Sequence, residues 1–251
     1  MTNKILEAVK EAREVFEIKD FPGNFFSHLR SGDFVNKHNL LLFKEDLDKL
    51  SGFIGYGKDN ITVICVNYKR PLGHQNFTLA HEIGHWLLHK GVSVSDDDSA
   101  FNASSDMEDE ANRFAKELLY PAKLMQQDYM HSIKYDLFSI NKRAELGEFI
   151  NDLCHKYCLS FDIVLRNLLY KNKQVSEYKK IRRQIEKSLG GKISEVFDKD
   201  FYVPNEELLE YQQLAAPYEK LKKSVDYLIK QKKIGRATGE AIKLRNRVGD
   251  K

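Results

Sequence analysis

Apolar and charged residues alternate with a helical period at the start of the chain. Between residues 2 and 18 the apolar side chains recur every three or four positions, which is typical of one face of an amphipathic helix. The segment FPGNFF at 21–26 then breaks this period, because proline and glycine favour a turn. The pattern therefore predicts one helix followed by a turn.

Two segments rich in β-branched and aromatic residues come next, SGFIGYG at 51–57 and NITVICVNY at 60–68. Residues of this kind favour strands, and the GKDN where the two segments meet favours a turn. We expect a hairpin or two adjacent strands within a small antiparallel sheet.

Helical spacing returns after residue 76. The segment PLGHQN at 71–76 indicates a loop, with Asn76 or Thr78 as the N-cap of a helix that continues to Gly91. The apolar residues of this helix recur on one face: Leu79, Ile83, Trp86 and Leu87. Residues 92–107, rich in Ser, Asp and Asn, are typical of a mobile surface loop.

A further helix is predicted from MEDEANRFAKELLYP at 107–121, where Pro121 follows the end of the helix. Its apolar face consists of Ala111, Phe114, Ala115, Leu118 and Leu119. Residues 144–170 predict two more helices, the second capped by Ser160. A helix-turn-helix interpretation of residues 150–170 is not favoured, because the second helix has one basic residue and too much apolar surface to read a DNA groove.

Charged helices are expected beyond residue 172, with breaks at 189–191 and near Pro204. We divide the chain into a first domain, residues 1–172, and a basic helical C-terminal region, residues 173–251. Residues 1–170 hold 20 basic and 25 acidic side chains, whereas residues 171–251 hold 20 basic and 12 acidic ones. Nucleic acid is therefore a possible partner of this tail, but a solvated helix face explains the charge better.

The composition is that of an ordinary globular protein, with 42% hydrophobic and 31% charged residues among 251. No apolar run approaches the roughly 20 residues that cross a bilayer, and the N-terminal segment has no signal-peptide pattern. The three cysteines, Cys65, Cys154 and Cys158, provide no disulfide framework. We expect a cytoplasmic protein without a membrane partner, in which Cys154 and Cys158 are core residues rather than zinc ligands.

The segment FTLAHEIGHWLLH at 77–89 carries the candidate chemistry. His81 and His85 are one helical turn apart, so both imidazoles can reach one ion, while Glu82 lies beside the first. In this HExxH arrangement two histidines hold Zn²⁺, which lowers the pKa of a bound water, and the glutamate accepts the proton. His89 lies about 12 Å beyond His81 along the helix axis. It is therefore expected to support the site or lie on the surface.

A catalytic zinc site has three protein ligands and an open position, so another helix must supply the third ligand. The acidic start of the predicted helix at 107–121 is the best source. Asp109 points away from the apolar face of that helix. Glu108 and Glu110 flank this face at similar angles, so both remain candidates for the third ligand. The alternative is that all three acids merely favour the positive N-terminus of the helix.

These two motifs together resemble the ImmA/IrrE family of metallopeptidases, which are gluzincin-like. The family pattern F-T-x-A-H-E-x-G-H followed by E-x-[EQ]-A-N-x-F-A-x-x-L-L-x-P is matched almost position by position, although Tyr120 stands where the family usually has methionine. The resemblance is clear over about residues 50–125. It implies zinc ligation by His81, His85 and Glu108, and a general base at Glu82.

The resemblance also implies an α+β fold, a zincin-like domain whose small sheet packs on the HExxH helix and on the glutamate-bearing helix. The activity it implies is cleavage of a helix-turn-helix repressor, which would derepress mobile-element or stress genes. An extended substrate would add to an edge strand, and the segment ITVICVNY is our choice for that strand. The oxyanion donor is unassigned; by residue type alone the candidates are His74, Tyr129 and His131. The competing hypothesis is a non-catalytic, zinc-stabilised module that binds a protein or nucleic acid through the basic tail.

Overall fold

The computed structural model describes residues 3–29, 37–56, 61–90, 94–95, 104–203 and 218–245. Its sheet has the strand order β1-β3-β2-β4. The strands are β1 (Leu40–Glu45), β2 (Gly52–Tyr56), β3 (Thr62–Asn67) and β4 (Val94–Ser95). The predicted pairing of the second and third strands is confirmed, because β2 runs antiparallel to β3 with Ile54 opposite Ile64.

The expectation of a purely antiparallel sheet is wrong, because β1 pairs with β3 in parallel, Leu40 opposite Thr62. The strand β1 was not predicted from the sequence. Every residue of β1 is buried, including Lys44 and Glu45, so the strand lacks the alternation of apolar and polar residues that reveals a half-exposed strand. The fold is α+β with a small mixed sheet.

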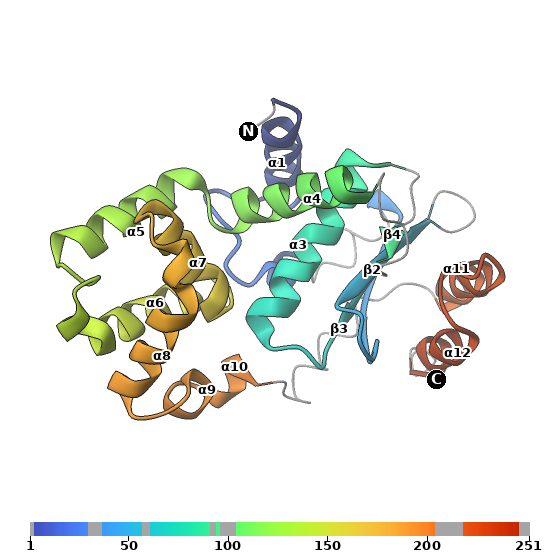
Figure 1. Ribbon diagram of the computed structural model, residues 1–251. Helices are drawn as coiled ribbons and strands as arrows, with labels where there is room; N and C mark the ends of the chain where they lie inside the picture. Colours follow the sequence, from blue (N-terminus) through green and yellow to red (C-terminus); the bar gives the residue numbers. More distant parts are fainter. Residues whose placement is uncertain are drawn as a thin grey trace.

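Three helices lie on one side of this sheet, and one of them packs directly against the strands (Figure 1). They are α1 (Asn3–Val15), α3 (Leu72–Leu88) and α4 (Ser104–Leu119). The helix α3 contacts β2 and β3 directly, while α4 packs along α3, and α1 lies against both helices. The apolar face predicted for α4 is confirmed, since its five residues from Ala111 to Leu119 are fully buried. A short 3-10 helix, η1 (Phe25–Leu29), packs against α3.

The helix α3 begins earlier than the sequence indicates. It starts at Leu72, preceded by Pro71, so most of the predicted loop 71–76 is helical and neither Asn76 nor Thr78 is the N-cap. Asn76 instead uses its buried carboxamide for distant partners. It accepts a hydrogen bond from Phe25 N at 2.7 Å, and it donates to Gly23 O at 2.9 Å and to Cys158 O at 3.0 Å. These contacts fasten the helix to two other parts of the chain.

A group of helices lies beside α3 and α4 on the side away from the sheet (Figure 1). It comprises α5 (Ala122–Lys134), η3 (Ile140–Lys142), α6 (Arg143–Tyr157), α7 (Phe161–Lys171), η4 (Val175–Glu177), α8 (Tyr178–Leu189), α9 (Ile193–Val196) and α10 (Lys199–Tyr202). The predicted cap is confirmed, because the Ser160 side chain accepts a hydrogen bond from Ile163 N. The predicted break after α8 is also present, with Gly190 at φ +81°. Pro204 lies outside the described residues.

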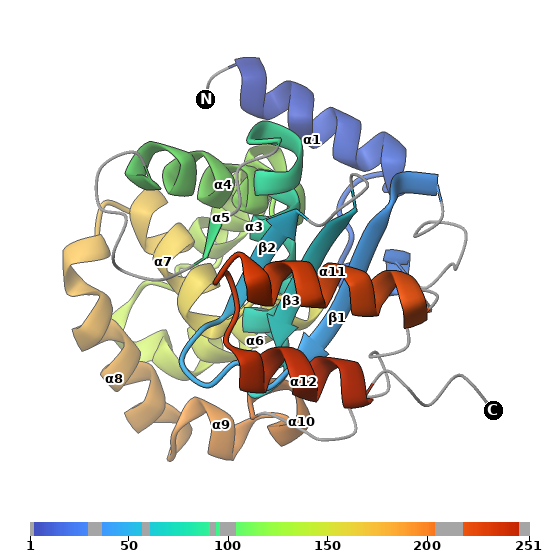
Figure 2. The same cartoon turned by 90° about the vertical axis from the view of Figure 1, so that its right-hand side faces the viewer.

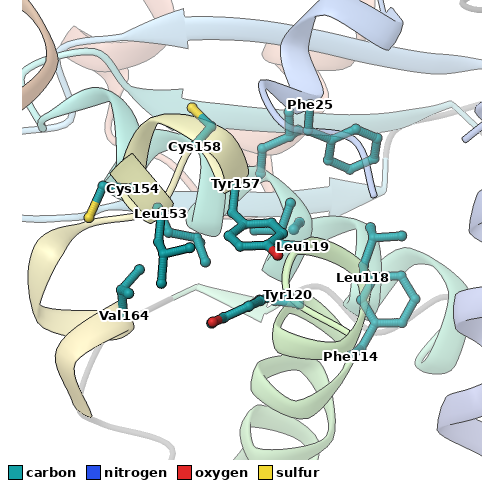
Figure 3. Packing of buried hydrophobic residues seen from close by; sticks show 14 of the residues in the cluster. Phe25, Phe114, Leu118, Leu119, Tyr120, Leu153, Cys154, Tyr157, Cys158 and Val164 are labelled. Atoms are coloured by element: carbon teal, nitrogen blue, oxygen red, sulfur yellow. The ribbon is translucent and has the colours of Figure 1, made fainter. Parts of the chain in front are cut away.

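The core between these helices and α4 is shown in Figure 3. Tyr120 and Tyr157 lie with their ring centroids 4.3 Å apart, and both hydroxyls donate to Asp128, at 3.1 and 2.7 Å respectively. Cys154 and Cys158 are buried in the same core, and burial raises the pKa of both thiols to about 12. Their interpretation as core residues is confirmed.

Two C-terminal helices, α11 (Tyr218–Lys230) and α12 (Arg236–Arg245), lie across the opposite face of the sheet (Figure 2). Their buried apolar residues form a second core with the strands: Leu41, Phe43, Val63, Cys65, Val225, Leu228 and Ile242 among others. Both faces of the sheet are therefore covered. The boundary at residue 172 stays a prediction, although helices beyond it pack on the sheet and on α6.

Most of the surface loop predicted at 92–107 lies outside the described residues. Of its described part, Val94–Ser95 forms β4 and pairs with β2, and α4 begins at Ser104, three residues before the predicted helix. Within the described ranges, no helix combines the length and the apolar character required to traverse a bilayer.

Candidate metal centre

Three side chains from two helices converge on one point between α3 and α4. His81 Nε2 and His85 Nε2 lie 3.0 Å apart, and Glu108 places one oxygen 3.0 Å from His81 Nε2 and the other 3.2 Å from His85 Nε2. His85 is 1% exposed, whereas the Glu108 side chain is 27% exposed. The cluster therefore has a buried inner side and an accessible outer side.

A close approach of the two helices brings Glu108 to the histidines. A Cβ on Gly84 would lie 2.9 Å from Phe114 Cδ1 and 3.2 Å from Ala111 Cα. The absence of a side chain at Gly84 thus lets α4 lie directly against α3 at the turn that carries the histidines. Glu108 is one helical turn before Ala111 and on the same side of α4.

The donor set fits a zinc ion. Two imidazole nitrogens and a carboxylate oxygen are typical of catalytic zinc sites, and with bonds of about 2.0–2.1 Å their donor atoms lie about 3.3 Å apart in a tetrahedron. The observed separations are 3.0–3.2 Å, and all three donors lie within 4.8 Å of one another. His81, His85 and Glu108 could therefore hold one ion and leave its outer side open.

The electrostatics favour an ionised carboxylate at this point. Partial burial raises the pKa of Glu108, but hydrogen bonds and charge interactions with His81 and His85 outweigh this effect and lower it to about 2. Glu108 is therefore negatively charged throughout the physiological range of pH, which would suit it to binding a divalent cation.

The other acids of this turn lie elsewhere. Asp109 is exposed, as its position on the helix predicts. Glu110 lies 3.0 Å from His89 Nε2 rather than beside the cluster, so the structure brings only Glu108 to both histidines. Helical periodicity could not show which of the two glutamates lies beside His81 and His85, because this depends on how α4 crosses α3.

Each histidine of the cluster has a partner on its outer nitrogen. His81 Nδ1 lies 3.2 Å from Asn112 Oδ1, and His85 Nδ1 lies 2.9 Å from His89 Nδ1. Such partners orient metal-binding imidazoles and select their tautomer. Asn112 was not predicted as a site residue from the sequence, although it is one turn after Glu108. Of the two roles expected for His89, the surface role is wrong, because the residue is 8% exposed.

Glu82, the predicted general base, is 2% exposed and lies beside β2. A Cβ on Gly52 would lie 3.2 Å from Glu82 Oε1 and 2.5 Å from Thr78 Cγ2, so glycine is needed where the strand passes this carboxylate. The strand chosen for substrate addition is wrong, because β3 is central and pairs with β1 and β2 on its two sides. In the described residues, β2 is the strand that lies next to Glu82.

The three oxyanion candidates have other contacts. His74 Nε2 lies 3.0 Å from Ser51 Oγ, Tyr129 lies 3.4 Å from the Asn172 side chain, and His131 stacks on Phe149. The oxyanion donor therefore cannot be assigned from residue type alone.

Comparison with known proteins agrees with this geometry. The IrrE N-terminal-like domain, peptidase family M78, matches residues 35–168, which include all four predicted site residues. The chain is also similar to the metallopeptidase ImmA of Bacillus subtilis (strain 168), with 28% identity over 114 residues that cover 45% of this chain and 67% of that protein. The resemblance inferred from the two motifs is thus confirmed, and the chain is a metallopeptidase that belongs to the IrrE N-terminal-like family.

Proposed function

We propose that the protein is a zinc-dependent endopeptidase in which His81, His85 and Glu108 bind the metal and Glu82 is the general base. One observation carries this proposal: the donor atoms of three residues from two helices converge at 3.0–3.2 Å. Glu82, which follows His81 in the motif, is a buried carboxylate. A cluster of this composition, open on one side, is what metal-assisted hydrolysis requires.

When bound there, the ion supplies Lewis-acid chemistry, polarising a carbonyl and making a water molecule more acidic. Glu82 accepts the proton of the attacking water and later gives it to the amine that leaves the cleaved peptide bond. Burial of Glu82 beside Gly52 limits its access to bulk water, so the proton is retained until the amine departs. Asn112 and His89 hold the imidazole rings in place.

The substrate is proposed to be a protein that presents an extended segment to β2. This strand lies beside Glu82. On its outer side β4 pairs with Phe53 and Ile54, and in the part of the chain that the structure describes the remaining residues of β2 pair with no strand on that side. An extended peptide can add to such an edge through main-chain hydrogen bonds. By analogy with the family resemblance, a helix-turn-helix repressor in the cytoplasm is the substrate class we favour.

The test is Glu82→Gln, which removes the base but keeps the shape of the side chain. We expect this variant to retain zinc and to lose cleavage by about 10²–10⁴-fold, the usual contribution of a general base. Expressed in the native cell, it would act as a trap, and the captured protein would then be the substrate in a cleavage assay with the purified wild type.

Asp109→Asn is the matched control, because it also neutralises one carboxylate but at an exposed position one residue from Glu108. It should cleave the captured protein at the wild-type rate. Normal cleavage by Glu82→Gln would refute the proposed role of Glu82. An intact biological output in that variant, combined with unfolding of a His85 variant, would instead support the non-catalytic zinc module.

A further inference from the structure

We propose that His89 and Glu110 are positioning residues that set the tautomer of His85 and thereby determine how tightly the site binds metal. This inference rests on the proposed metal site at His81, His85 and Glu108. It concerns residues that do not contact the ion themselves. Their effect passes through one hydrogen bond to the outer nitrogen of His85.

The direction of that hydrogen bond follows from the geometry. His85 Nε2 faces His81 and Glu108, so its lone pair is the one available to an ion. The proton of the neutral ring must then be on Nδ1, which lies 2.9 Å from His89 Nδ1. Two N–H groups cannot face each other at this distance, so His89 Nδ1 must accept, and the proton of His89 must be on Nε2.

Glu110 completes this assignment. His89 Nε2 lies 3.0 Å from Glu110 Oε2, so the N–H that the first step requires finds a carboxylate acceptor. In the hydrogen-bonded series from His85 through His89 to Glu110, every N–H donor then has an acceptor. No other placement of the protons pairs each donor with an acceptor and also leaves a lone pair on His85 Nε2. A carboxylate behind a histidine also increases the basicity of the ligand.

Burial makes this hydrogen bond matter. The side chains of His85 and His89 are 1% and 5% exposed, so water cannot replace a lost partner. His89 is the C-cap of α3, one turn after His85, and its backbone N–H donates to His85 O at 2.9 Å. The helix itself thus holds the two rings on the same face.

Lys4 on α1 also reaches Glu110, with its Nζ 3.1 Å from the same oxygen that faces His89. The Lys4 side chain is 54% exposed, so this ion pair is screened by solvent. We therefore expect Lys4 to add little to metal binding.

The experiment measures zinc affinity in competition with a chromophoric chelator and records the visible spectrum of the Co²⁺-loaded protein. His89→Phe should bind zinc about 10–100-fold more weakly, the usual effect of losing a partner of a metal-bound histidine. Glu110→Leu should weaken binding in the same direction. Glu110→Gln should retain most of the zinc affinity of the wild type, because the amide oxygen of glutamine can still accept a hydrogen bond from His89 Nε2–H.

Lys4→Met and Asp109→Asn are the controls and should bind zinc like the wild type. The Co²⁺ spectrum should be shifted in His89→Phe and Glu110→Leu but close to that of the wild type in Glu110→Gln, which keeps an acceptor. This pattern distinguishes positioning of His85 from a general loss of stability. Glu110 is partly exposed, so its variants keep the test open even where His89→Phe fails to fold. Wild-type zinc affinity in Glu110→Leu, or equal losses in Glu110→Gln and Glu110→Leu, would overturn the inference. A wild type that binds no zinc would overturn the proposed function as well, whereas zinc binding without cleavage would refute the proposed function alone.

Discussion

The close approach of α3 and α4 at Gly84 makes Gly84→Ala a sharp test of how packing builds the site. The added methyl would lie 2.9 Å from Phe114 Cδ1 and 3.2 Å from Ala111 Cα, both closer than ordinary contact. Phe114 is fully buried and cannot turn away, so α4 must move by a few tenths of an ångström. Glu108 is on the same helix, one turn away, and must move with it.

Gly84→Ala is expected to change the stability of the protein less than its affinity for zinc. Overpacking costs about 1–3 kcal/mol, while alanine in place of glycine within a helix stabilises by about 1 kcal/mol, so the net loss of unfolding free energy is at most about 2 kcal/mol. Metal–ligand distances in protein sites are expected to lie within about 0.2 Å of their standard values. We therefore expect zinc affinity to fall by about tenfold or more, with a modest loss of stability.

Zinc affinity by chelator competition and urea unfolding of the metal-free protein measure the two effects separately. Gly147→Ala is the matched control, since a Cβ there would lie 2.7 Å from Ile185 Cγ2, at the contact of α6 with α8. It should lose stability to a similar extent and keep its zinc affinity. Unchanged zinc binding in Gly84→Ala, or an equal loss of zinc affinity in Gly147→Ala, would refute the reasoning.

Three further substitutions test the packing described above. Burial lowers the pKa of Lys44 to about 7, against about 10.4 in the unfolded chain, so the folded state binds fewer protons between these values and stability falls as pH decreases from 10 to 7. Lys44→Met should therefore be more stable by on the order of 4 kcal/mol at pH 7, from the difference between these pKa values at about 1.4 kcal/mol per pH unit, and the gain should vanish above pH 10. Equal gains at pH 7 and above pH 10 in urea unfolding would contradict this. Asn76→Ala leaves three backbone groups without their partner and should cost on the order of 3 kcal/mol in the same assay. Tyr120→Phe removes one of the two hydroxyl groups that donate to Asp128 and should cost only about 1 kcal/mol in the same assay, because Tyr157 still donates; a larger loss would show that the two hydroxyl groups are strongly coupled.

Much of the local structure could be predicted from the sequence, because it depends on neighbours along the chain. The spacing of His81 and His85 and the buried face of α4 follow from helical periodicity, and the cap at Ser160 follows from side-chain chemistry. The β2–β3 hairpin is a similar case, since its strands are joined by a short segment.

Features that depend on distant contacts could not be predicted in this way. The strand β1 has a continuous apolar run without a period, and its parallel pairing with β3 requires a partner more than 20 residues away. The start of α3 was misplaced because Asn76, a common cap residue, bonds to backbone groups of Phe25 and Cys158 instead. The selection of Glu108 over Glu110 likewise depends on the approach of two helices at Gly84.

The bonds of Asn76 have a consequence for the order in which the protein matures on the ribosome. Both motifs of the proposed metal site leave the exit tunnel before Cys158, whose carbonyl is one of the three partners of Asn76 that fasten α3. A nascent chain that already holds His81, His85 and Glu108 therefore lacks part of the support of its central helix. All three partners of Asn76 are therefore present only after about fifty more residues have been translated beyond Glu108.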